Sequence, residues 1–155
     1  MTALKSLLFL ILVPGVFIGV IPPLFLFTGP YIETGFLSRL ALPLWVIGGA
    51  VILWCFWDLF SKGHGTPAPM DPPKELIVTG LYNYVRNPMY VGVLAMLLAH
   101  FLWFGFWLLL AYAILLFFGF HTFVTLYEEP TLKKKFGKAY KDYLKRVPRW
   151  LSGRK

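Results

Sequence analysis

The sequence predicts an all-α, polytopic membrane protein with about four transmembrane helices and an amphipathic C-terminal helix. Of its 155 residues, 58% are hydrophobic and only 14% are charged, and the mean hydropathy is +0.68. The hydrophobic residues stand in long runs, which a soluble domain of this length could not bury. Aromatic residues make up 19% of the chain, a content typical of proteins with aromatic belts at both membrane interfaces. The length indicates a single domain, residues 1–155.

Two apolar stretches, at about residues 4–27 and 36–60, are each long enough to span a bilayer core. Prolines within the first stretch predict kinks, which neighbouring helices can accommodate. No small-residue cleavage site follows it, so we expect it to be retained rather than removed as a signal peptide. Gly48-Gly49 in the second stretch predicts a close contact with another helix.

Residues 61–87 form a polar loop whose density of proline and glycine excludes regular structure over its first half. The loop is too long for a plain connector, and loops of this length tend to be functional or disordered. His64 has no second histidine or cysteine nearby, and Cys55 is the single cysteine of the chain. The sequence therefore predicts neither a metal site nor a disulfide.

The next apolar run, residues 88–127, is too long for one helix across a hydrocarbon core of about 30 Å. It predicts two spans, at about 88–104 and 105–127, folded as a tight hairpin that turns near residues 100–105. We expect Glu128-Glu129-Pro130 to end this hairpin abruptly, because a proline interrupts a helix.

The remaining residues, 128–155, form a basic tail in which apolar side chains recur at steps of three and four. This spacing predicts an amphipathic helix that lies at the membrane surface and is closed by Pro148-Arg149-Trp150. The apolar stripe consists of Leu132, Phe136, Tyr140, Tyr143, Leu144 and Val147.

The charge distribution predicts that both termini are cytoplasmic. An even number of spans places them on one side, and most of the net charge of +8 falls in the tail on that side. Concentrated there, the charge indicates contact with anionic membrane lipids rather than nucleic acid. The loop 61–87 lies on the same side and is also basic, whereas the opposite loops carry only Arg39, at the start of the second span.

The stretch from Gly80 to Gly92 joins the polar loop to the third span and contains the strongest candidate binding residues. Asn87 is a natural N-cap for a helix that begins at Pro88, so the free N–H groups of that helix would face the loop. Arg86 adds a planar donor fork beside the same helix end, and this combination suits a carboxylate or a phosphate. The alternative is an arginine that only anchors the helix at lipid headgroups.

Glu128 and Glu129 stand at the same membrane boundary, and with Arg86 they form a candidate site for a zwitterionic ligand. The glutamates would take an ammonium group or ribose hydroxyls while Arg86 takes a carboxylate. The alternative is that they only terminate the span and pair with tail lysines. His121 lies two turns earlier on the same helix face, where a hydrogen bond to a neighbouring helix is a simpler explanation than a catalytic base. The sequence has no phosphate-binding loop, dinucleotide fingerprint or serine elbow.

Several motifs in the second half of the chain resemble the isoprenylcysteine carboxyl methyltransferase family, integral membrane enzymes related to the phospholipid N-methyltransferases. They are Gly65-Thr-Pro-Ala-Pro69, Val78-Thr-Gly-Leu-Tyr82 and Tyr84-Val-Arg-Asn-Pro-Met-Tyr-Val-Gly92, then Glu128-Glu129, Leu132, Phe136-Gly137, Tyr140, Tyr143 and Val147-Pro148. The resemblance covers about residues 61–150 and is specific, because the order and the spacing of several motifs agree at once. Asn87 stands where the eukaryotic enzymes usually carry histidine, and asparagine at this position resembles the bacterial relatives. Asparagine cannot titrate, so no general base is expected at this position.

The resemblance implies S-adenosylmethionine as methyl donor, bound at the cytoplasmic boundary of the membrane. It implies Arg86 and Glu129 as catalytic residues, and a lipophilic small molecule or a lipid-borne group as methyl acceptor, with no metal. The donor-binding residues that it implies are Arg86, Asn87, Tyr90, Gly92, Glu128, Glu129, Tyr140 and Tyr143.

The sequence leaves open which group accepts the methyl. A carboxylate or thiolate acceptor needs no strong base, whereas an amine would lose a proton to Glu128, Glu129 or water. Two other functions also stay open: a membrane reductase that uses NADPH, and a small anchor subunit whose charged residues only contact lipid headgroups.

Overall fold

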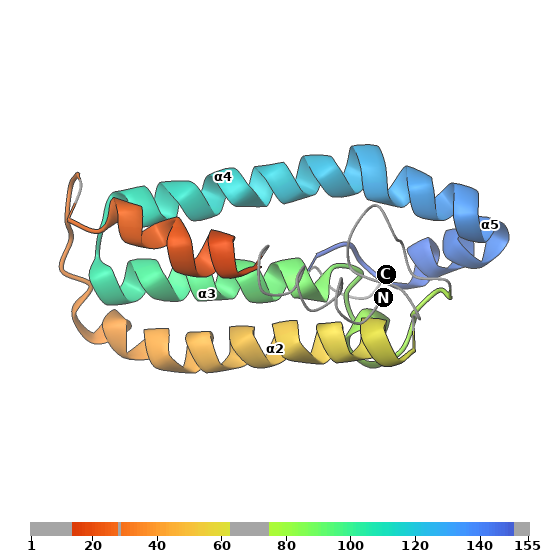
Figure 1. Cartoon of the computed structure of the whole chain (residues 1–155), viewed down its shortest axis with the longest axis horizontal. Coiled ribbons are helices and arrows are strands. Elements are labelled where there is room, and N and C mark those ends of the chain that lie inside the picture. The colour runs from red at the N-terminus through yellow and green to blue at the C-terminus, as the bar shows by residue number, and fades with distance from the viewer. Residues whose placement is uncertain (1–13, 28, 63–74, 151–155) are drawn as a thin grey trace.

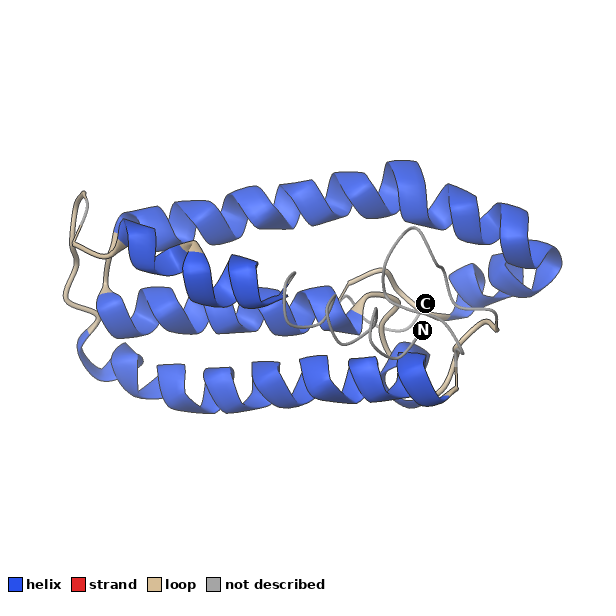
Figure 2. Ribbon diagram, viewed as in Figure 1, coloured by secondary structure: helices blue, strands red, loops and turns tan. Residues whose placement is uncertain are grey.

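The computed structural model of the chain describes residues 14–27, 29–62 and 75–150. Within these residues the secondary structure is helical, apart from an isolated bridge between Tyr31 and Phe106 (Figure 2). Three expectations lie outside the described residues: the first part of the span at 4–27, the loop 63–74 with His64 and the Gly65–Pro69 motif, and the last five residues.

The elements follow in the order η1 (Val16–Val20), η2 (Pro22–Phe25), η3 (Gly35–Leu40), α2 (Ala41–Ser61), η4 (Gly80–Asn83), α3 (Pro88–Phe104), α4 (Trp107–Phe123), η5 (Val124–Glu128) and α5 (Glu129–Arg146). The helices α2, α3 and α4 lie side by side as an elongated bundle, with the N-terminal helical turns against α3 and α4 (Figure 1). The all-α class is therefore confirmed.

Two helical segments of the described chain, Gly35–Ser61 and Trp107–Arg146, are long and apolar enough to cross a membrane. Two shorter apolar helices, Val16–Phe25 and Pro88–Phe104, accompany them. The outward side chains of the bundle are large and hydrophobic, and include Val46, Leu115 and Phe118. An apolar outer surface of this kind fits a lipid environment.

Helices α2 and α3 approach closely through a pair of glycines. A Cβ atom on Gly48 would lie 2.8 Å from the carbonyl oxygen of Gly92, and one on Gly92 would lie 2.9 Å from the carbonyl oxygen of Gly48. Neither position has room for a side chain, which confirms the close contact predicted at Gly48. The same prediction was wrong for Gly49, which has nothing within 4 Å of its Cβ position.

Helices α3 and α4 form the expected hairpin, and its short turn at Gly105 and Phe106 lies at the end of the stretch 100–105 where it was predicted. Helix α3 continues to Phe104, and Gly105 closes it in the left-handed conformation with φ of 75°. A Cβ atom at Gly105 would collide with the carbonyl oxygen of Ile32, so glycine is required there. His100 consequently lies within α3, where the Trp45 indole donates to its Nδ1 atom at 3.2 Å.

The expectation that Glu128-Glu129-Pro130 ends the hairpin is wrong, because the chain stays helical from Trp107 through Pro130 and breaks only at Gly137. The π-helical turn η5 ends at Glu128, two residues before Pro130, which occupies the first turn of α5. A widened turn accommodates the proline ring where a regular α-helix would bring it against the carbonyl four residues earlier.

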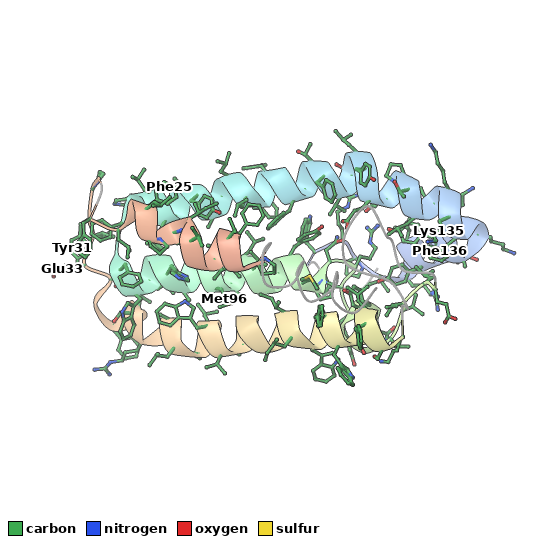
Figure 3. All side chains as sticks on the ribbon, in the orientation of Figure 1. Phe25, Tyr31, Glu33, Met96, Lys135 and Phe136 are labelled. Carbon is green, nitrogen blue, oxygen red and sulfur yellow. The ribbon has the colours of Figure 1, made fainter. Side chains whose placement is uncertain are left out.

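The direction of the chain changes at Gly137 instead. This residue has φ of 54° and ψ of −121°, outside the helical region and accessible mainly to glycine. The predicted amphipathic helix is therefore two pieces, and the second piece turns back toward the bundle (Figure 1). Lys135 and Phe136 mark this end of the molecule, whereas Tyr31 and Glu33 mark the opposite end (Figure 3).

Candidate functional site

The candidate site is centred on Glu129, which two arginines from distant parts of the chain hold between them. Arg86 Nη1 donates to Glu129 Oε1 at 2.8 Å, and Arg149 donates to Oε1 through Nε at 2.7 Å and to Oε2 through Nη2 at 3.0 Å. Glu129 is only 6% exposed, so water does little to weaken these interactions. The structure therefore brings together Arg86 and Glu129, as the sequence predicted, and adds Arg149.

The segment after α5 places Arg149 in this position. The helix ends where Val147 adopts an extended conformation. Beyond it, the backbone N–H of Arg86 donates to the carbonyl of Pro148 at 2.9 Å, and the Asn87 side-chain amide donates to the carbonyl of Arg149 at 3.1 Å. Residues 86–87 and 148–149 thus lie against each other and present both guanidinium groups to Glu129.

Asn87 occupies the N-cap position of α3 as predicted, but its side chain does not cap the helix. Its amide is instead committed to the carbonyl of Arg149. The local rule for caps is overridden here by a tertiary contact, because the segment carrying Arg149 supplies an acceptor that the sequence could not reveal.

The adjacent carboxylates Glu128 and Glu129 differ in their surroundings. The uncharged apolar run of their helix ends at Tyr127, so both carboxylates follow it. Burial raises the pKa of Glu128 to about 7, opposed by a hydrogen bond from the Tyr90 hydroxyl at 3.2 Å and reinforced by the charge of Glu129. For Glu129, burial is outweighed by the hydrogen bond from Arg149 and the charges of both arginines, which lower its pKa. Glu129 is therefore the fixed anion of the site, and Glu128 is a carboxyl group that titrates near neutral pH.

Tyrosine side chains lie beside the charged residues of the site. The ring of Tyr90 stacks on that of Phe120 at a centroid distance of 4.6 Å. Tyr140 and Tyr143 are both 3% exposed; Tyr140 lies within electrostatic range of Arg86 and Glu129, and the Tyr143 hydroxyl donates to the carbonyl of Tyr82 at 2.6 Å.

Gly92 lies apart from this cluster. The contact with α2 at Gly48 is sufficient to explain why position 92 is a glycine. A small residue at this point of α3 is needed for packing, whatever further role it has.

Arg149 and Trp150 are the site residues that sequence reasoning missed. The Trp150 indole donates to His121 Nδ1 at 3.2 Å and packs against Phe117. The partner of His121 is therefore the C-terminal segment, not a neighbouring helix. The available signal was an arginine and a tryptophan directly after the end of an amphipathic helix, at the membrane boundary where such side chains meet polar ligands.

The charges and hydrogen-bonding groups of this cluster fit an anionic ligand. Two guanidinium groups contact the single carboxylate of Glu129, and the neighbouring Glu128 is only partly ionised near neutral pH, so the cluster carries a net positive charge. Arg86 Nε is buried and has no hydrogen-bond partner among the described residues. A buried donor without a partner is costly, and a ligand carboxylate or phosphate would remove that cost. No group of three or more metal-ligating side chains occurs in the part of the chain that the structure describes.

Comparison with known proteins identifies one family. The family model described as phospholipid methyltransferase matches residues 37–139 of the chain. The matched region begins just before α2 and includes Arg86, Glu128 and Glu129. The match confirms the resemblance noted from the motifs, since this family includes the isoprenylcysteine carboxyl methyltransferases. No solved structure matches the chain.

Proposed function

Because the chain belongs to the phospholipid methyltransferase family of membrane enzymes, we propose that it transfers a methyl group from S-adenosylmethionine to a lipophilic or lipid-borne acceptor at the cytoplasmic membrane boundary. The acceptor atom is the oxygen of a carboxylate, the sulfur of a thiol or the nitrogen of an amine. The whole chain serves as one methyltransferase domain. We assign it to the bacterial type because it has asparagine at position 87, as bacterial relatives do.

The proposed topology has about four spans, with both termini cytoplasmic. The helices Gly35–Ser61 and Trp107–Arg146 support two of the spans. In this arrangement α3 and the N-terminal helix, although shorter, would cross beside them, and the basic residues of α5 would meet anionic headgroups. The cluster around Glu129 would then face the cytosol, where the methyl donor is found.

The observation that carries the proposal is the buried Arg86–Glu129–Arg149 cluster. Arg86 would hold the donor's methionyl carboxylate through its unpaired Nε–H, since a guanidinium recognises a carboxylate in a fixed geometry. Glu129 takes part by holding the two guanidinium groups in place, because both of its oxygens already accept hydrogen bonds from them. Glu128 has no arginine partner among the described residues, and it is the glutamate left to meet the donor directly.

When bound, S-adenosylmethionine supplies an electrophilic methyl group carried on a sulfonium. The stacked rings of Tyr90 and Phe120 offer aromatic faces that attract a cation beside Glu128. For an amine acceptor, Glu128 can take the proton that the amine must lose, since its pKa lies near 7. For a carboxylate or thiolate acceptor the residues need only hold the two reactants in line and exclude water.

The two rival functions predict different ligands. A membrane reductase would bind NADPH, and an anchor subunit would bind neither cofactor. Family membership supports the methyltransferase, and so does the cluster, because a mere headgroup anchor has no need of a buried carboxylate held between two arginines.

A thermal-shift experiment on the purified protein separates the three functions. Stabilisation by S-adenosylmethionine, without stabilisation by NADPH, is the expected result, since a ligand raises the melting temperature only if it binds the folded state. A methyl-transfer assay with labelled donor on a total membrane lipid extract then identifies the acceptor. A protein stabilised by NADPH alone, or by neither compound, contradicts the proposal.

A further inference from the structure

Asp58 is the second buried charged residue of the described chain, and it lies outside the cluster around Glu129. It stands near the end of α2 and is only 2% exposed. Its Oδ1 atom accepts a hydrogen bond from Lys62 Nζ at 2.6 Å, whereas Oδ2 is buried with no hydrogen-bond partner among the described residues. A buried carboxylate with only one oxygen paired lowers the stability of the fold, so its presence calls for an explanation in terms of another role.

The surroundings of Asp58 connect α2 to the segment that precedes Arg86. Lys62 also donates to the Thr79 hydroxyl at 3.3 Å, so one ammonium group links the end of α2 to residue 79. Directly after it, Gly80 adopts φ of +60°, and a Cβ atom there would lie 2.5 Å from Asp58 Oδ2. Only glycine can take this conformation against this carboxylate, so the backbone at residue 80 is seated on Asp58.

The turn that begins at Gly80 is fixed on its other side by α5. The carbonyl of Tyr82 accepts the hydrogen bond from Tyr143, and the Tyr82 side chain interacts with Cys55, one turn before Asp58 on α2. The backbone N–H of Val85 donates to the carbonyl of Leu81 at 3.2 Å. The turn Gly80–Asn83 is therefore held between α2 and α5, and Arg86 follows three residues after its end.

We propose that Asp58 is a positioning residue that, with Lys62, seats the turn at Gly80–Asn83 and thereby fixes where Arg86 stands against Glu129. A carboxylate suits this task because one oxygen holds Lys62, while the other lies against residue 80, where only a glycine leaves room for it. An apolar side chain would fill the same space but would leave Thr79 and Gly80 without the ammonium bridge.

Hydrogen exchange on the detergent-solubilised full chain tests the positioning directly and requires no enzymatic activity. Asp58→Asn keeps the size of the side chain and removes its charge, so the Lys62 bridge weakens. Amides of residues 79–87 should exchange about tenfold faster or more, the scale of one lost charged hydrogen bond, while those of α3 and α4 stay unchanged. Asp142→Asn is the matched control, since among the described residues Asp142 forms an ion pair with Lys145 alone, at 3.8 Å, and its side chain is 48% exposed.

Lys62→Gln provides a second variant should Asp58→Asn fail to fold, because Lys62 lies at the surface. It should accelerate exchange in the same residues to a smaller extent. Unchanged exchange at 79–87 in either folded variant overturns the proposal. So does an equal acceleration throughout α3 and α4, which would show that Asp58 only contributes to global stability.

A double-mutant cycle with Arg86 tests the functional half of the inference, which rests on the proposed function. Asp58→Asn should weaken binding of S-adenosylmethionine about tenfold in the wild-type background and have almost no further effect in Arg86→Lys. If the losses of donor affinity in the two single variants simply add in the double variant, Asp58 does not act through Arg86. If the wild-type protein binds no S-adenosylmethionine, the proposed function fails, and the exchange data alone decide whether Asp58 positions the turn.

Discussion

Replacing Arg86 by lysine separates the two roles that a boundary arginine can have. Lysine keeps the positive charge and reaches lipid headgroups equally well, so a headgroup anchor would tolerate the change. A lysine lacks the planar fork, so it cannot bind Glu129 and a ligand carboxylate in the geometry that arginine allows. The variant should therefore fold normally and lose most of its methyl-transfer activity.

The geometry of the cluster sets the size of this effect. The Arg86–Glu129 contact is 2.8 Å long, with the two side chains only 13% and 7% exposed, so solvent screens it weakly. One charged hydrogen bond at such a position contributes about 1.5–3 kcal/mol. Donor affinity should then fall about tenfold to 150-fold. The fold should survive, because Arg149 keeps both oxygens of Glu129 engaged in the variant.

Isothermal titration with S-adenosylmethionine and turnover on the identified acceptor would measure both quantities. Arg39→Lys is the matched control, since Arg39 is exposed in η3 and contacts only the ring of Phe36 among the described residues. Weakened donor binding assigns the bound anion to the donor carboxylate, whereas intact donor binding with lost turnover assigns it to the acceptor. A folded Arg86→Lys protein with near-normal turnover and donor affinity would refute the reasoning.

Three further predictions concern the glutamates, the glycine contact and the topology. Turnover on an amine acceptor should rise with pH through about 7 as Glu128 loses its proton, and Glu128→Gln should remove this rise. Glu129→Gln should instead weaken donor binding by about 1.5–3 kcal/mol. Normal donor affinity in both variants would leave the glutamates without a role in the site. Gly92→Ala should lower the free energy of unfolding by about 1–3 kcal/mol because its methyl group meets α2, while Gly49→Ala, which faces open space, should not; equal thermal melting curves would contradict the close contact. Reporter fusions should place the C-terminus in the cytoplasm, and an external C-terminus would contradict a site that draws its donor from the cytosol.

Hydropathy and residue type were sufficient to predict the helical class, the hairpin and two residues of the candidate site. An apolar run of about 40 residues must fold back on itself whatever its neighbours, because the bilayer core has a fixed thickness. Arg86 and Glu129 were identified from their own chemistry at the membrane boundary, and the structure places them in direct contact. Hydropathy and side-chain charge are properties of short stretches of chain, so they can be read from the sequence alone.

The tertiary structure decided which groups are partners. Arg86 and Glu129 are 43 residues apart and Arg149 follows 20 residues later, so no local pattern shows that one carboxylate joins them. The course of the chain after Tyr127 was also decided by context. A π turn carries the helix through Pro130, and the direction changes at Gly137, because the contacts of the second half of α5 with the loop before α3 outweigh local helix rules. Long-range packing and the pairing of buried charges fixed the site, since their energies depend on which distant segments meet.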